Sequence, residues 1–223
     1  MYDLVIFEID YTFRAFDPLS RALVVNLFFG ICSVFVGFFV SIAWTLIATL
    51  AARSIAWALT LVLSFIRGTP LLVQIFCIYF LLPRFGLDLS ATTSALIALT
   101  LHTSAFMAEI MRGGLASIPP SQYEAAHALG LKGVALWSRI IIPQMMIKIV
   151  PPLINEFVLM MKATPLVSVI AITEALRTAQ QIYSANFRAL ETLAALAVIF
   201  LLLNLTISRL GQTVERRLRV RTL

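Results

Sequence analysis

Charged side chains are scarce in this 223-residue sequence: Asp, Glu, Lys and Arg together make up 13% of it, whereas 61% of the residues are hydrophobic. The mean hydropathy is +0.96. A water-soluble globular domain carries about 25% charged and about 45–50% apolar residues, so the composition excludes that class. We therefore expect a lipid bilayer to be the main solvent of the chain.

Cysteine and histidine are also rare, with two residues of each kind. Cys32 and Cys77 lie in apolar runs, which favours small core residues over a disulfide framework. His102 and His127 lack a neighbouring set of Cys, Asp or Glu suited to binding a metal ion. We predict no metal site.

Two catalytic patterns are missing as well. The sequence has no G-x-x-x-x-G-K-[ST] phosphate loop, so any ATP hydrolysis must belong to another polypeptide. It also has no plausible set of nucleophile, base and orienting residue. We predict that the chain is not an enzyme and that it binds no cofactor itself.

What the sequence does have is long apolar runs, bounded by charges, prolines or glycines. A helix needs about 20 mostly apolar residues to cross a bilayer. With no evident repeat or second domain, the pattern predicts an all-α integral membrane protein with about five transmembrane helices in a single domain, 1–223. The five runs are Leu23–Ala52, Ile55–Pro83, Ala91–Met111, Pro143–Met161 and Ala189–Leu210.

Basic residues between these runs predict the orientation, because Lys and Arg in short loops are retained on the cytoplasmic side. An N-terminus outside and a C-terminus in the cytoplasm place ten basic residues inside and five outside. Ser117–Ile142 is then the one substantial cytoplasmic loop, and the net charge of +6 needs no nucleic-acid partner. The inner residues are Arg53, Arg112, Lys132, Arg139, Lys148, Arg209, Arg216, Arg217, Arg219 and Arg221; the outer ones are Arg14, Arg21, Arg84, Arg177 and Arg188.

The cytoplasmic loop carries signals for a short helix. Ser121 and Glu124 have the spacing of a capping box after two prolines, so we expect a helix from Gln122. Gly130 predicts its end. The helix would offer an apolar face for docking into a partner groove, although an ordinary connecting loop is the other possibility. The expected face is Tyr123, Ala126 and Leu129.

The same loop resembles a known family. Glu124-Ala125-Ala126, Gly130 and the run IIIP from Ile140 match the pattern EAA-x3-G-x9-I-x-L-P of ABC importer permeases, with Ile142 in place of Leu. The runs RGTPLLVQ from Arg67 and AEIMRGG from Ala108 resemble the polar amino acid uptake members of that family. The similarity extends from about residue 67 to residue 181.

This resemblance implies a type I ABC importer-like subunit, multi-pass in a bacterial plasma (inner) membrane. It would form the translocation pathway for a polar amino acid or related small molecule with a second permease, of the same or a similar chain. Its other partners would be membrane lipid, a dimer of ATP-binding subunits using ATP–Mg, and a periplasmic or extracellular binding protein. The segment from Gln122 to Gly130 would be the coupling helix. Its ATPase-coupling residues would be Glu124, Ala125, Ala126 and Gly130.

Ionisable residues at membrane depth are costly and are therefore candidates for function. Glu109 and Arg112 are three residues apart, so we interpret them as a structural pair on one helix face. Glu156 and Lys162 are six apart and share no helix face unless the helix breaks, which the proline of Thr164-Pro165 favours. Arg67 completes the set.

An amino acid presents one ammonium and one carboxylate group. Glu156 suits the ammonium, and the planar fork of Arg67 suits the carboxylate. The resemblance adds Lys162, because residues 155–166 look like the family's substrate-proximal stretch, with Ala163 where the family commonly has Asp. We assign Arg67, Glu156 and Lys162 to substrate binding. The alternative is that Arg67 and Glu156 pair with each other or with neighbouring subunits.

A different functional class also fits the helix count, namely a secondary transporter or channel that works without ATP. Such transporters usually carry internal repeats within a longer chain, and none is evident here. We keep it as the alternative.

Overall fold

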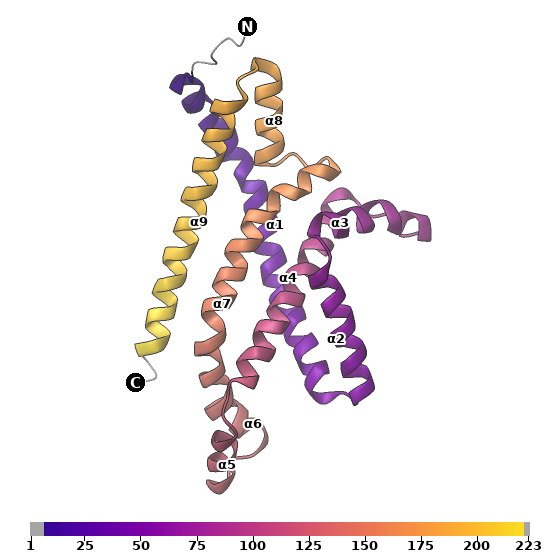
Figure 1. The fold of residues 1–223 in the computed structure, drawn as a ribbon, viewed down its shortest axis with the longest axis vertical. Helices are drawn as coiled ribbons and strands as arrows, with labels where there is room; N and C mark the ends of the chain where they lie inside the picture. Colours follow the sequence, from indigo (N-terminus) through magenta and orange to yellow (C-terminus); the bar gives the residue numbers. More distant parts are fainter. Residues whose placement is uncertain (1–6, 221–223) are drawn as a thin grey trace. The chain divides into compact units, whose positions relative to one another are not determined.

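The computed structural model describes residues 7–220, with side chains up to residue 218, and no strand occurs in that part of the chain. The all-α prediction is therefore confirmed. Asp3 and Arg221, and the side chain of Arg219, lie outside what is described. The helices are α1 (Ile9–Leu50), α2 (Arg53–Gly68), α3 (Leu71–Phe76), α4 (Ala91–Ala116), α5 (Pro120–Ala128), α6 (Gly133–Leu136), α7 (Ile142–Ala163), α8 (Ala175–Asn186) and α9 (Ala189–Val220) (Figure 1).

Within residues 7–220, four continuous helical stretches are long and apolar enough to cross a membrane. They are Ile9–Leu50, Ala91–Ala116, Gly133–Ile170 and Ala189–Leu218. The last three each contain one of the predicted apolar runs, and the first overlaps the run Leu23–Ala52 as far as Leu50. A fifth crossing exists if Arg53–Gly68 and Leu71–Phe85 together count as one span. The expectation of about five transmembrane helices is therefore confirmed.

The second predicted span, Ile55–Pro83, was wrong in shape. Its two helical parts meet at an angle of 106°. Pro70 follows directly after Thr69, and the proline ring forces the preceding residue out of the helical region, so Thr69 adopts φ −105° and ψ 143°. The apolar pattern continues through this bend, which is why hydropathy alone shows a single run.

The first helix begins at Ile9, earlier than the predicted start at Leu23. Its early turns contain Pro18 and two acidic residues, which led the sequence prediction to start the span too late. Ala15 and Leu19 are nevertheless buried, against Ala residues of α8 and α9. Packing of this face stabilises the helix despite its polar residues, as is usual for helices in proteins.

The fold divides into two compact units, and the four long helices each contribute to both. The first unit contains residues 7–33, Pro70–Leu99 and Leu159–Thr206, with its core around Leu19, Ala179 and Leu196. The second contains Val34–Thr69, Thr100–Val158 and residues 207–220. The single domain 1–223 stays a prediction.

Two clusters of buried apolar residues lie in the second unit. Leu59 and Leu63 of α2 pack on Ala105 and Ala108 of α4, where the small side chains allow close approach of the helices. The other cluster lies in the loop after α4 and contains Ile118, Ala126, Leu136 and Ile141. Figure 1 shows α5 and α6 beyond the C-terminal end of α4.

Candidate functional site

The predicted coupling helix exists as α5, but it starts differently from the prediction. Pro119 is the N-cap residue and Pro120 the first helical residue. A proline is well suited to this place because its missing N–H would have no partner there and its φ is already helical. No side chain caps the helix start, so the predicted capping box of Ser121 and Glu124 is wrong.

The end of α5 agrees with the prediction. Gly130 has φ +76°, a left-handed conformation that a side chain makes costly. Its N–H donates to the carbonyl of His127 over 2.9 Å, and the N–H of Leu131 donates to the carbonyl of Ala126 over 2.9 Å. These two bonds form a Schellman motif, which satisfies the last carbonyls of the helix.

The predicted apolar face of α5 is not available to a partner as a whole. Ala126 is 2% exposed and Tyr123 packs beside it, so both contribute to the loop's own core. Leu129 is 78% exposed. Glu124 and Ala125 are exposed as well. The surface that remains for docking therefore comprises Glu124, Ala125 and Leu129, which we call the loop surface.

The start of α7 braces this loop with two hydrogen bonds that the sequence did not indicate. The Gln144 side-chain amide donates to Gln122 Oε1 over 2.9 Å. Lys148 Nζ donates to the carbonyl of Ser117 over 2.6 Å, at the C-terminal end of α4. Both bonds therefore connect the first residues of the loop, Ser117 and Gln122, to α7.

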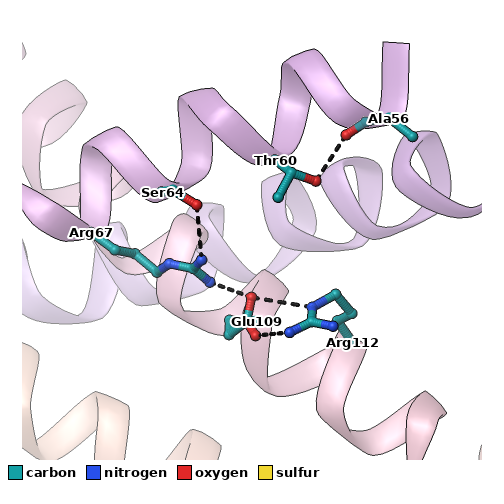
Figure 2. Close-up of polar contacts among 6 residues, drawn as sticks. All are labelled: Ala56, Thr60, Ser64, Arg67, Glu109 and Arg112. Atoms are coloured by element: carbon teal, nitrogen blue, oxygen red, sulfur yellow. Dashed lines mark hydrogen bonds and ion pairs between the residues drawn. The ribbon is translucent and has the colours of Figure 1, made fainter. Parts of the chain in front are cut away.

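Arg67 lies in an ion cluster that joins α2 to α4 (Figure 2). The predicted pair of Glu109 and Arg112 is confirmed. Arg112 donates to both oxygens of the Glu109 carboxylate, and Arg67 donates to Oε2 as well. Ser64 Oγ also accepts a bond from Arg67, over 3.5 Å. Two guanidinium groups on one carboxylate leave an excess positive charge. The Arg67 side chain is 21% exposed, against 65% for Arg112.

Arg67, Glu109 and Arg112 line a pocket of about 100 Å³ in the second unit. Trp44 of α1, with Thr60 and Leu63 of α2, forms other parts of its wall. The pocket is thus partly apolar, with a cationic side. Such a combination suits an anionic group on a small ligand.

Glu156 lies in α7 and is 6% exposed. Thr103 of α4 donates a hydrogen bond to its Oε1 over 3.1 Å. Among the residues that the structure describes, no basic side chain forms an ion pair with it. The predicted alternative of a pair between Glu156 and Arg67 is therefore wrong within the chain, because the partner of Arg67 is Glu109. A buried carboxylate without a cationic partner can form an ion pair with a positively charged ligand.

Comparison with known proteins shows the family of this chain. The family described as binding-protein-dependent transport system inner membrane components matches residues 33–220. The chain belongs to this family. It is therefore an inner-membrane transport component, not an enzyme.

Two relatives illustrate the similarity. The L-cystine transport system permease protein TcyB of Bacillus subtilis is 33% identical over 207 residues, 92% of this chain and 88% of the relative. The glutamine transport system permease protein GlnP of Escherichia coli is 38% identical over 157 residues, 70% of this chain and 72% of the relative.

Solved structures agree with these relatives. A crystal structure of an amino acid ABC transporter with histidines superposes with a TM-score of 0.88 at 32% identity, and the match covers 96% of this chain and 100% of that one. The MetNI methionine ABC transporter in an inward-facing conformation gives 0.74 at 17% identity, over 90% and 96% of the two chains. The second match shows the fold alone.

The helix break predicted at Thr164-Pro165 is present in this binding-protein-dependent permease. α7 ends at Ala163, a 3₁₀ helix covers Thr164–Ile170, and Ala171 follows with φ 64°. Lys162 is exposed in the last turn of α7 and belongs to the first unit, whereas Glu156 belongs to the second. Its predicted role in substrate binding stays a prediction.

A buried polar network at this break was missed in the sequence. The side-chain amide of Asn26 donates to Thr164 Oγ1 over 3.0 Å and to Glu174 Oε2 over 2.9 Å. Glu174 also caps α8 by accepting from the N–H groups of Leu176 and Arg177, each over 2.8 Å. The available signal was Asn26, a lone amide in a long apolar run. Because these donors satisfy the hydrogen-bonding capacity of the Glu174 carboxylate, we assign it a structural role.

Proposed function

We propose that this chain is the permease subunit of an ATP-driven importer of amino acids or closely related polar compounds. The observation that carries the substrate class is the set of compounds in the relatives' names, among them L-cystine, glutamine and octopine. Each of these carries both an amino group and a carboxylate. The isolated carboxylate of Glu156 and the cationic pocket at Arg67 supply the two complementary charges.

The partners follow from the family and from the loop geometry. A second permease, identical or similar, completes the translocation pathway, and an external binding protein delivers the substrate. A dimer of ATP-binding subunits hydrolyses ATP–Mg. The loop surface contacts it through Glu124 and Ala125. Ala126 and Gly130 act differently, because one anchors α5 in the loop core and the other shapes its C-terminal end.

In the proposed recognition, Glu156 binds the substrate's ammonium group. Arg67 binds its carboxylate, which requires Arg67 to exchange Glu109 for the substrate. This exchange is inexpensive because Arg112 stays paired with Glu109 and keeps that carboxylate compensated. The side-chain chemistry is therefore complete for a zwitterion.

Uptake into proteoliposomes tests the substrate class. The chain is reconstituted with an ATP-binding subunit and a binding protein from the same genome, and labelled L-glutamine, L-arginine, L-cystine, octopine and maltose are compared. We expect uptake of one or more of the four amino compounds. This uptake should require ATP inside the vesicles, where the ATP-binding subunits hydrolyse it. Maltose, which lacks both charged groups, is the control. Uptake of maltose and of none of the amino compounds would contradict the proposal.

Glu156→Gln tests the site within this assay. Loss of one charge-assisted contact in a dry site weakens binding by about 1.5–3 kcal/mol, so we expect a roughly tenfold to hundredfold loss of affinity. Basal ATP hydrolysis and assembly of the complex should be retained. Unchanged uptake would remove Glu156 from the site.

A further inference from the structure

The hydroxyl of Thr103 is the hydrogen-bond donor that orients the Glu156 carboxylate. It donates to Oε1 over 3.1 Å, and both side chains are buried, Thr103 at 0% and Glu156 at 6% exposure. A carboxylate has room for about four hydrogen bonds in the plane of its oxygens. One bond from a fixed hydroxyl sets the direction of the group and leaves further positions for a ligand.

Gly37 of α1 lies directly against Thr103. A Cβ atom at residue 37 would be 2.6 Å from Thr103 Cγ2, and 3.4 Å from both the Ser104 nitrogen and the Thr100 oxygen. Two of these three atoms belong to the backbone of α4, which cannot yield locally. The Thr103 methyl group would therefore have to move.

Movement of that methyl group necessarily moves the hydroxyl, because both are bonded to the same Cβ atom. Threonine in a helix has two favoured χ1 rotamers, and one of them turns the hydroxyl toward a carbonyl of the preceding turn. A side chain at residue 37 would thus shift Thr103 away from the rotamer that reaches Glu156.

We infer that Gly37 and Thr103 are positioning residues for recognition of the substrate's amino group. Because Gly37 has no side chain, Thr103 keeps the rotamer in which its hydroxyl donates to Glu156. That hydrogen bond orients the Glu156 carboxylate toward the ligand's ammonium group. The inference rests on the proposed function, in which Glu156 binds that group. Neither residue touches the substrate. They act through the direction of one carboxylate, as supporting residues do around a preorganised site.

Four variants separate positioning from simple packing. Gly37→Ala introduces the overlap with the Thr103 methyl group. Thr103→Val keeps the shape but removes the donor. Thr103→Ser keeps the donor and removes the methyl group, so the double variant Gly37→Ala with Thr103→Ser has no overlap. Gly113→Ala is the matched control, because an added Cβ there meets nothing within 4 Å.

The measurement is direct binding to the purified permease–ATPase complex without the binding protein. The probe is whichever of labelled L-glutamine, L-arginine, L-cystine and octopine gives the highest uptake, compared with its analogue that has hydrogen in place of the amino group. We expect Gly37→Ala and Thr103→Val to weaken binding of the probe roughly tenfold, the cost of a misdirected charge-assisted bond. Binding of the analogue should not change. Thr103→Ser, the double variant and Gly113→Ala should bind the probe as the unaltered chain does.

Three outcomes would overturn the inference. Equally weakened binding of the probe and of the analogue would show a packing defect. If the double variant failed to restore binding, Gly37→Ala would not act through the Thr103 rotamer. Normal binding by Gly37→Ala and Thr103→Val, with weak binding by Glu156→Gln, would reject the positioning role while leaving the proposed function intact. If Glu156→Gln also bound normally, the proposed contact itself would fail.

Discussion

At the scale of single residues, Glu109 determines what Arg67 can do. The sequence showed Glu109 and Arg112 as neighbours on one helix face, and that pair is present. It did not show Arg67, because a contact across 42 positions depends on how α2 folds back beside α4. Glu156 illustrates the same limit: its burial could be predicted from the apolar run, but its partner Thr103 lies 53 positions away.

Charge replacements at this cluster distinguish a ligand role from a structural one. Arg67→Gln should lower substrate affinity while the complex assembles, because Arg112 still compensates Glu109. Glu109→Gln should instead cost about 1–3 kcal/mol of stability, since it leaves two guanidinium groups without their carboxylate in a partly buried site. The measurements are thermal unfolding of the purified complex and uptake.

The double variant Arg67→Gln with Glu109→Gln is the control for this prediction. It removes one charge of each sign, so we expect recovered stability without recovered uptake. Recovery of both would make Arg67 part of a structural ion cluster only, and would remove it from the substrate site.

At the scale of elements, local sequence signals predicted the C-terminal end of helix α5 better than its start. Gly130 marked the end of α5 because its left-handed conformation favours glycine at that position. The start was misplaced, because Pro119 and Pro120 form the cap that Ser121 and Glu124 were expected to provide. The bend after Gly68 was missed for another reason: apolar residues continue on both sides of Pro70, and a hydropathy average does not register backbone direction.

The coupling role of α5 can be tested with substitutions in the helix and at its C-terminal end. Gly130→Asp forces a side chain into a left-handed conformation, at a cost of about 1 kcal/mol, and Glu124→Lys reverses a charge on the loop surface. We expect both variants to insert in the membrane but to lose the ATPase or its coupling. Copurification of the ATPase and uptake are the measurements.

Ser121→Ala is the matched control, because Ser121 is exposed and forms no capping bond. It should copurify the ATPase and transport normally. The docking role of α5 would be contradicted if Gly130→Asp and Glu124→Lys behaved like Ser121→Ala in both measurements.

At the scale of the whole molecule, composition and hydropathy were sufficient for the fold class and the number of spans. A run of about 20 apolar residues has few alternatives in a bilayer, because every backbone polar group must be satisfied within the segment. The division into two units was not predicted, since each of the four long helices contributes to both. Orientation is also set at this scale, by the distribution of Lys and Arg among the loops.

Accessibility tags test the predicted orientation. A tag placed after Arg221 should react only from the cytosol, and one before Asp3 only from outside, because ten basic residues lie on the predicted inner side and five on the outer. Modification by a membrane-impermeant reagent in intact and opened cells is the measurement. Two tags on the same side would mean an even number of crossings, and α2 with α3 would then not form a span.

The source of energy tests the importer assignment most directly, because an ATP-independent carrier or channel could have the same number of helices. The decisive measurement is substrate uptake by proteoliposomes that contain the complex, with either an intact ATP-binding subunit or one made unable to hydrolyse ATP. Uptake should depend on ATP hydrolysis and persist after ionophores have collapsed every ion gradient. Uptake that continues with the inactive ATP-binding subunit and stops with the ionophores would contradict the assignment and favour a secondary transporter.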